Sequence, residues 1–174
     1  MSAPPRHSVA SLSRGGRDAF VAALGGVFEH SPWVAEQAWE ARPFATVDEL
    51  HRAMVAAVGR SPREAQIALV RAHPELAGKE AAAGTMTADS IGEQQSAGLD
   101  RCTPEETARL RDLNRRYRER FGFPFVMAVR GRSRHEIMDA IEARLGNDAE
   151  TELQRCLAEI AKITRLRLDA MFAA

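Results

Sequence analysis

Large apolar residues recur along this chain three, four and seven positions apart, and that spacing is typical of amphipathic helices. One predicted helix carries Phe20, Leu24 and Phe28, and another carries Leu50, Met54 and Val58. The pattern predicts helices over about 17–28, 31–39, 46–58, 61–73, 103–121, 133–145 and 149–172. With one shorter helix near 90–97, the chain is expected to be all-α, a bundle of about eight helices.

Local start signals support these boundaries. Ser31, Thr46, Ser61 and Ser133 each precede an apolar periodic run, as N-cap residues do. The sequence Thr103-Pro104-Glu105-Glu106 combines a capping threonine, a first-turn proline and a glutamate three residues after the cap. These signals favour helices that begin at defined positions.

Three stretches depart from the helical pattern. Residues 1–13 are rich in Ser and Pro and are expected to form a flexible N-terminus. Residues 74–88 are rich in Gly and Ala and are expected to form a mobile or surface connector. Residues 125–129 are the one candidate for a short strand. The remainder, 14–174, is expected to be a single domain, because 174 residues suit one core better than two.

The composition of the chain argues against several classes of function. Lys plus Arg and Asp plus Glu number 24 each, so the zero net charge argues against general binding to nucleic acid. No apolar run approaches the roughly 20 residues of a membrane span. Two cysteines without a C-x-x-C, and no secretory signal, favour a reducing cytoplasm. We expect no metal and no nucleotide cofactor, because neither a ligand cluster nor a glycine-rich phosphate loop is present.

His73 is the first candidate for chemistry. It follows a predicted helix, precedes Pro74 and borders the Gly/Ala-rich connector. A histidine held there can act as a general acid or base near neutral pH. The alternative is a helix-end histidine that interacts with a carbonyl or with the helix dipole.

The segment from Ser90 to Gln94 is the second candidate. Ser90, Glu93, Gln94 and Ala97 fall at i, i+3, i+4 and i+7, so one helical face offers a hydroxyl, a carboxylate and an amide. Such an amide suits a ureido or cyclic imide group. The alternative is that Ser90 and Glu93 form a capping box that starts a helix.

Two further positions could contact a ligand. Gly122 and Pro124 interrupt an aromatic run, which predicts irregular backbone with free N–H and C=O groups beside Phe123 and Phe125. On the final helix, Arg167 falls near the centre of the apolar face. An arginine there requires an anion, either a ligand carboxylate or an internal ion pair.

These segments together resemble the 2-oxo-4-hydroxy-4-carboxy-5-ureidoimidazoline (OHCU) decarboxylase family of urate degradation. The resemblance runs through nearly the whole chain in the right order. It is carried by FVAALGGVFEHSPWVAEQAW, RPF, RAHPELA, SIGEQQSAGLD, LNRRYRERFGFPFVMAVRGRS and EIAKITRLRL. It implies an all-helical homodimer that needs no cofactor and converts OHCU to (S)-allantoin and carbon dioxide.

The resemblance also assigns roles residue by residue. It implies that His73 and Glu93 are catalytic. The substrate-binding residues that it implies are Pro74, Ser90, Ile91, Gly92, Gln94, Phe123, Phe125, Val126, Met127, Ala128, Val129 and Arg167. Two other functions remain open on the sequence: a non-enzymatic helical interaction module, and a cofactor-free lyase or hydrolase that acts on another purine-pathway intermediate.

Overall fold

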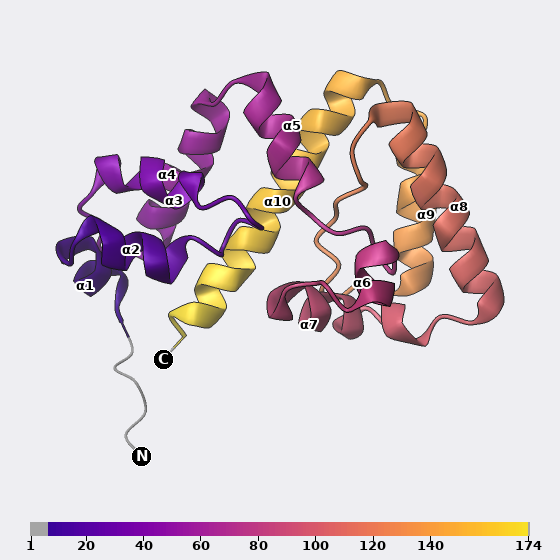
Figure 1. Ribbon diagram of the computed structural model, residues 1–174, viewed down its shortest axis with the longest axis horizontal. Coiled ribbons are helices and arrows are strands. Elements are labelled where there is room, and N and C mark those ends of the chain that lie inside the picture. Colours follow the sequence, from indigo (N-terminus) through magenta and orange to yellow (C-terminus); the bar gives the residue numbers. More distant parts are fainter. Residues whose placement is uncertain (1–6, 174) are drawn as a thin grey trace, which may run out of the picture. The chain divides into compact units, whose positions relative to one another are not determined.

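The computed structural model describes residues 7–173, and these residues form ten α-helices and two short 3-10 helices (Figure 1). The helices are α1 Val9–Arg14, α2 Arg17–Leu24, α3 Trp33–Ala38, η1 Trp39–Ala41, α4 Val47–Arg60, α5 Arg63–Arg71, α6 Lys79–Ala83, α7 Ala88–Ser96, η2 Leu99–Arg101, α8 Pro104–Phe121, α9 Arg134–Arg144 and α10 Ala149–Met171. No strand occurs within 7–173, so the prediction of an all-α fold is confirmed.

The chain divides into two compact units. Residues 7–69 and 161–173 form one, which we call the terminal unit, and Val70–Ile160 form the other, the central unit. Helices α5 and α10 each run from one unit into the other. A single domain over 14–174 stays a prediction.

The core of the terminal unit is built around aromatic and aliphatic side chains from α2, α3 and α4. The ring of Phe20 lies 5.1 Å from that of Trp39 and 6.2 Å from that of Phe44. Leu50 and Met54, one turn apart on α4, are fully buried. Thr46 caps α4, so the predicted boundary is confirmed, and it also forms a capping box with Glu49.

In the N-terminal third, residues 1–6 lie outside the described residues, and most of α1 lies within the predicted flexible segment 1–13, whose flexibility stays a prediction. The capping box of α1 joins Ser8 and Ser11. Two helix boundaries differ from the sequence prediction. Helix α2 ends at Leu24 rather than near 28, because Gly25 and Gly26 follow it. Ser31 does not cap α3, since its hydroxyl donates to the carbonyl of Glu29 at 2.8 Å.

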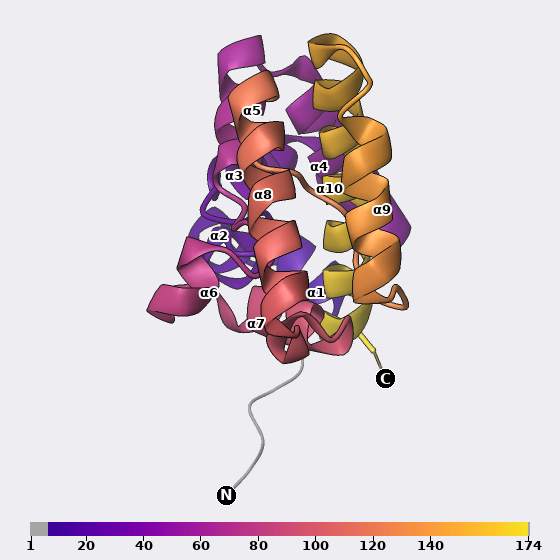
Figure 2. The ribbon, with the colours of Figure 1, turned by 90° about the vertical axis from the view of Figure 1, so that its right-hand side faces the viewer.

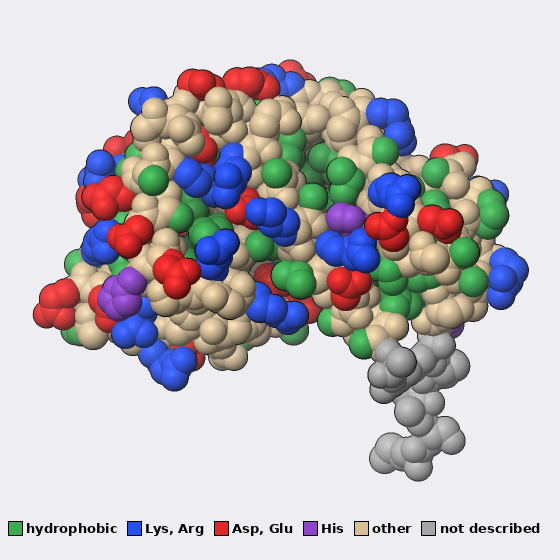
Figure 3. Space-filling model, turned by 180° about the vertical axis from the view of Figure 1, so that it is seen from behind, with side chains coloured by type: hydrophobic (Ala, Val, Ile, Leu, Met, Phe, Trp, Pro, Cys, Tyr) green, Lys and Arg blue, Asp and Glu red, His purple; other side chains and the backbone are tan. Residues whose placement is uncertain are grey.

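In the central unit, α8 packs beside α9, as both ribbon views show (Figures 1 and 2). Helix α8 buries Leu110, Leu113 and Tyr117 along one stripe. Its opposite face carries surface ion pairs, such as Arg115 with Asp112 and Glu119. Helix α8 therefore has a charged, solvent-exposed face. Figure 3 shows cationic and anionic side chains interspersed across one face of the molecule.

Two elements of the central unit differ from the sequence prediction. The expected connector 74–88 contains the short helix α6, which ends where Gly84 adopts a φ of 69°. Residues 125–129 form no strand, because no neighbouring strand within the described chain pairs with them. They instead run as buried irregular backbone between α8 and α9.

None of the helices within 7–173 combines the length and the apolar character that crossing a membrane requires.

Candidate active site

His73 lies just beyond the end of α5, where the sequence places it. The helix ends at Arg71, and the backbone N–H of His73 still donates to the carbonyl of Val70 at 3.1 Å. Pro74 follows, and it disfavours any continuation of the helix. The His73 side chain is 5% exposed. The local backbone therefore holds a buried histidine at the first turn of the loop to α6.

Helix α7 presents the polar face that its spacing predicts. Ser90, Gln94 and Ala97 are buried, and Glu93 between them is half-buried. The N-cap is Thr87, whose side chain accepts from the N–H of Ser90. The alternative capping box of Ser90 and Glu93 is therefore wrong, because Ser90 already lies inside the first turn.

Gln94 joins α7 to the loop that follows His73. Its side-chain oxygen accepts a hydrogen bond from the Ala77 N–H at 2.8 Å. Its side-chain nitrogen donates to the carbonyl of Glu75 at 3.3 Å. The residue directly after Glu93 thus holds the backbone two and four positions after His73. Gln94 was predicted to bind substrate, and in the structure its side-chain amide forms hydrogen bonds with the loop.

Asn114 is a residue that the sequence interpretation missed. From α8 it donates to the carbonyl of Leu76 at 2.9 Å. The buried side-chain amides of Asn114 and Gln94 therefore form hydrogen bonds with three consecutive loop residues, 75–77. The loop needs this support, because Ala77 adopts a left-handed φ of 48°, which is costly for a residue with a Cβ. The available sequence signal was a polar residue on the apolar stripe of α8, one position after Leu113.

A cavity of about 410 Å³ lies beside α7 in the central unit. Among the predicted site residues, Ile91 and Gln94 line it, whereas His73 and Glu93 do not. Its remaining walls come mainly from small or apolar residues of the 77–86 stretch and from Leu99. The cavity brings together two of the predicted residues, on the side of α7 that faces α6.

The predicted segment from Phe123 to Val129 is buried apart from Ala128, which is half-buried. The ring of Phe125 meets that of Tyr117 edge-on, with centroids 5.4 Å apart. The carbonyl of Val126 accepts a hydrogen bond from Arg144 at 2.9 Å. The segment is therefore buried irregular backbone with aromatic side chains, and its contact with substrate stays a prediction.

Arg167 is 6% exposed, so its predicted inward orientation is confirmed. Its guanidinium donates to Glu29 at 3.0 Å and to the carbonyl of Val27 at 3.2 Å, both within the terminal unit. Glu29 is itself 2% exposed. The internal ion pair that was one alternative for this arginine is present, and contact with substrate stays a prediction.

The described residues contain no cluster of three His, Cys, Asp or Glu side chains that could hold a metal ion. The expectation of a reaction without metal or cofactor stays a prediction from the sequence.

The chain is similar to known proteins over most of its length. The model of a family described as OHCU decarboxylase matches residues 13–169. The chain is 46% identical over 156 residues to a 2-oxo-4-hydroxy-4-carboxy-5-ureidoimidazoline decarboxylase of Haloferax volcanii, and the match covers 90% of each chain. It is 44% identical over 145 residues to the uric acid degradation bifunctional protein PucL of Bacillus subtilis, and this match covers 83% of the chain but 28% of that protein.

A solved structure has the same fold. The crystal structure of an (S)-allantoin synthase superposes with a TM-score of 0.76 at 28% identity, covering 95% of this chain and 54% of that one. Most of the chain is matched by the family model and by a full-length relative well above 30% identity. The protein is therefore a member of the OHCU decarboxylase family.

Proposed function

We propose that this protein decarboxylates OHCU to (S)-allantoin and carbon dioxide without a cofactor. The observation that carries the proposal is the grip of Gln94 on the loop after His73. It ties the loop that begins at His73 to the helix that bears Glu93. A non-enzymatic interaction module has no need of a buried histidine at the start of a loop that is held to a carboxylate-bearing helix in this way.

The substrate supplies its own electron sink. Carbon 4 of OHCU carries both a hydroxyl and a carboxylate, and the imidazoline ring has a carbon–nitrogen double bond at the adjacent carbon 5. When the bond to carbon dioxide breaks, its electron pair forms a double bond between carbons 4 and 5. The former carbon–nitrogen pair moves to nitrogen, which takes up a proton. The product of this step is an enol.

The enol must then become allantoin. The hydroxyl at carbon 4 loses its proton and becomes a carbonyl, while carbon 5 gains a proton on one face. Glu93 and His73 orient and activate the hydroxyl, and His73 delivers the proton that sets the configuration at carbon 5. Correct positioning of these two groups is the main source of the acceleration.

The other predicted residues hold the substrate. Arg167 receives an anionic or carbonyl group, and Gln94 adds the amide hydrogen that it does not give to Glu75. Pro74, Ser90, Ile91 and Gly92 form one wall. Phe123, Phe125 and the backbone of 126–129 form the other, and the aromatic rings exclude water.

Product handedness gives the decisive assay. OHCU is generated in situ from urate with the two upstream enzymes, and the circular dichroism of the allantoin formed is followed over time. We expect this protein to accelerate the decay of OHCU and to yield the S enantiomer in excess. Unchanged decay with racemic product would overturn the proposal. A faster decay of some other purine-pathway intermediate in the same assay would favour a different lyase or hydrolase.

The resemblance further supports a homodimer in the cytoplasm, and we include both in the proposal. Sedimentation equilibrium of the purified protein tests the first. A mass of one chain of 19.1 kDa at micromolar concentration contradicts it. Fractionation of the native cells tests the second.

A further inference from the structure

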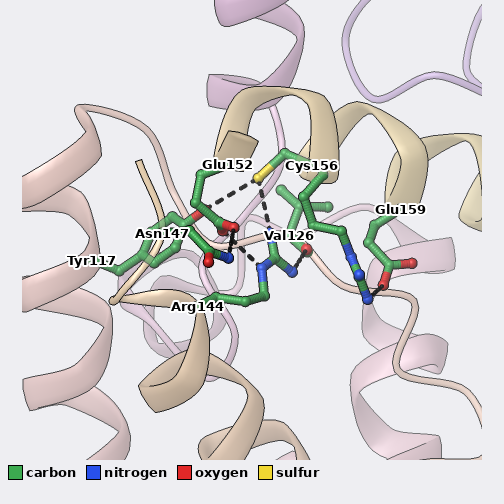
Figure 4. A network of polar contacts seen from close by, with 8 residues as sticks. Tyr117, Val126, Arg144, Asn147, Glu152, Cys156 and Glu159 are labelled. Atoms are coloured by element: carbon green, nitrogen blue, oxygen red, sulfur yellow. Dashed lines mark hydrogen bonds and ion pairs between the residues drawn. The ribbon is translucent and has the colours of Figure 1, made fainter. Parts of the chain in front are cut away.

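A buried polar network lies behind the wall-forming segment 123–129 of the central unit. Figure 4 shows Arg144 at its centre, with Glu152 and Tyr117 on one side, Val126 on the other and the sulfur of Cys156 above the guanidinium. None of these contacts takes part in the acid–base chemistry proposed above. The role of this network therefore has to be found elsewhere.

The carboxylate of Glu152 is fully buried and has a partner for each oxygen. Its Oε1 accepts from Arg144 Nε at 2.7 Å and from the Tyr117 hydroxyl at 2.6 Å. Its Oε2 accepts from Asn147 at 3.0 Å. Burial, and then its neighbours Cys156 and Glu152, raise the pKa of Tyr117 well above the usual range, so its hydroxyl stays a donor. The ion pair of Arg144 and Glu152 carries no net charge, and both carboxylate oxygens have hydrogen-bond donors.

The other two nitrogens of Arg144 contact two further residues, Val126 and Cys156. Nη1 donates to the carbonyl of Val126 at 2.9 Å, and Nη2 contacts the sulfur of Cys156 at 3.4 Å. The guanidinium carbon also lies 4.3 Å from the centre of the Phe125 ring. The planar fork of an arginine allows these three contacts at once, which a lysine ammonium cannot reproduce.

Cys156 contacts Val126 through the backbone N–H of that residue. Burial raises the pKa of the Cys156 thiol, and hydrogen bonds from Tyr117 and from the Val126 backbone oppose that rise. The N–H of Val126 thus faces Cys156, and its C=O faces Arg144. Both backbone groups of Val126 are engaged by the network.

Peptide planarity then fixes the neighbouring groups. In a trans peptide the C=O and the N–H point in opposite directions. The carbonyl of Phe125 and the N–H of Met127 share their peptides with Val126, so both point away from the network. Neither group makes a hydrogen bond to another part of the described chain. Buried backbone groups of this kind require a partner.

We propose that Arg144 is a positioning residue, which with Cys156 turns the Phe125 carbonyl and the Met127 N–H toward the substrate. Together the two groups form an acceptor and a donor that flank Val126. A ureido group offers the matching N–H and C=O, so this edge of the segment would bind the ureido arm. The inference rests on the proposed function for the identity of the ligand.

Two substitutions isolate the effect. Arg144→Lys keeps a cation beside Glu152 but loses the fork, and we expect kcat to fall by about 10- to 100-fold through misplacement of the segment. The S excess of the product should fall as well, because the substrate is held less firmly. Cys156→Ala removes the acceptor for the Val126 N–H and should show a smaller loss, which Cys156→Ser should largely restore.

Ile137→Ala serves as the matched control for lost stability. Ile137 is fully buried on the same helix as Arg144, and its truncation removes no hydrogen bond to Val126. It should lower the urea midpoint while kcat per folded molecule and the S excess stay near those of the wild type. If Arg144→Lys behaves in the same way as Ile137→Ala, the network is only structural and the inference is overturned.

Hydrogen exchange of the Val126 amide separates this inference from the proposed function. We expect faster exchange in Arg144→Lys and in Cys156→Ala than in wild type, and an unchanged rate in Ile137→Ala. If the wild type leaves OHCU decay unchanged, the proposed function fails, while faster exchange still supports the hold on Val126. Unchanged exchange in both variants overturns the positioning role whatever the activity.

Discussion

The side-chain oxygen of Gln94 lies 2.8 Å from the backbone nitrogen of Ala77 and accepts its hydrogen bond. Gln94 follows Glu93 on α7, and Ala77 follows His73 in the loop before α6. One buried amide thus connects the two segments that carry the proposed acid–base residues. The geometry of the pair depends on a residue whose amide was expected to serve the substrate.

Gln94→Leu should therefore impair both the fold and the reaction. The substitution leaves the Ala77 N–H and the Glu75 carbonyl without their partner, which we expect to cost about 1–3 kcal/mol of unfolding free energy. Activity should fall with it, because the loop after His73 loses one of its two amide supports. Urea denaturation and initial rates measure the two effects. Gln95→Leu, at the exposed neighbouring position, is the control, and equal losses in the two variants would contradict the account.

Substitutions at Arg167 and Glu29 separate two roles of this arginine, the internal ion pair and the proposed contact with substrate. Arg167→Met alone takes a partner from a carboxylate that is 2% exposed, and should cost about 3–5 kcal/mol of stability. The double variant Arg167→Met/Glu29→Leu removes both charges and should recover much of that loss. Thermal or urea unfolding of the two variants gives the comparison.

Activity of the double variant then decides whether Arg167 also binds substrate. If it does, the refolded double variant stays inactive because its KM for OHCU rises steeply. Restored stability together with wild-type KM would assign Arg167 to the ion pair alone.

Two glycines near the site should respond in opposite ways. A Cβ on Gly92 meets nothing within 4 Å, so Gly92→Ala should stabilise α7 by about 0.5–1 kcal/mol through its higher helix propensity. A Cβ on Gly78 would lie 2.5 Å from the Cβ of Glu75, so Gly78→Ala must displace the loop and should cost about 1–3 kcal/mol. Urea midpoints measured side by side check both signs, and a stabilising Gly78→Ala would contradict the tight turn.

Acid should weaken the contact between α8 and α9 through Glu106. A hydrogen bond from Arg134, and further hydrogen bonds from Thr103, lower the pKa of Glu106 from 4.5 to about 2. Because the folded value lies below the unfolded one, the contribution is complete above pH 4.5 and is lost as the pH falls toward 2. Glu106→Gln should flatten this part of the profile. A variant whose stability declines between pH 4.5 and 2 as steeply as the wild type would contradict the assignment.

Helix boundaries with explicit caps were predictable, since Thr46, Thr103 and Ser133 act where the sequence places them. The start of α7 was not, because Thr87 and Ser90 both precede plausible first turns and only the fold selects Thr87. The strand suggested at 125–129 failed for a related reason. Apolar residues flanked by Pro and Gly also suit buried irregular backbone, and the sequence does not show the absence of a pairing partner.

Some features of the candidate site residues were predictable from spacing, whereas their contacts were not, and their roles toward substrate stay predictions. Spacing placed Ser90 and Gln94 on one helical face and Arg167 on an apolar face, and all three residues are buried. Asn114 and Arg144 escaped notice because they lie within charged helices whose polar residues are mostly solvated. Their burial depends on which residues of distant segments they meet, such as Leu76 and Val126.

The most direct test of the central claim, that His73 and Glu93 act together on one substrate, is a double-mutant cycle in kcat for OHCU. His73→Asn and Glu93→Gln should each lower kcat by about 10²- to 10⁴-fold while unfolding as cooperatively as the wild type. Because residues that act as a unit are not additive, the double variant should be about as slow as the slower single variant. A loss in the double variant equal to the product of the single losses, or near-wild-type turnover in either single variant, would contradict the account.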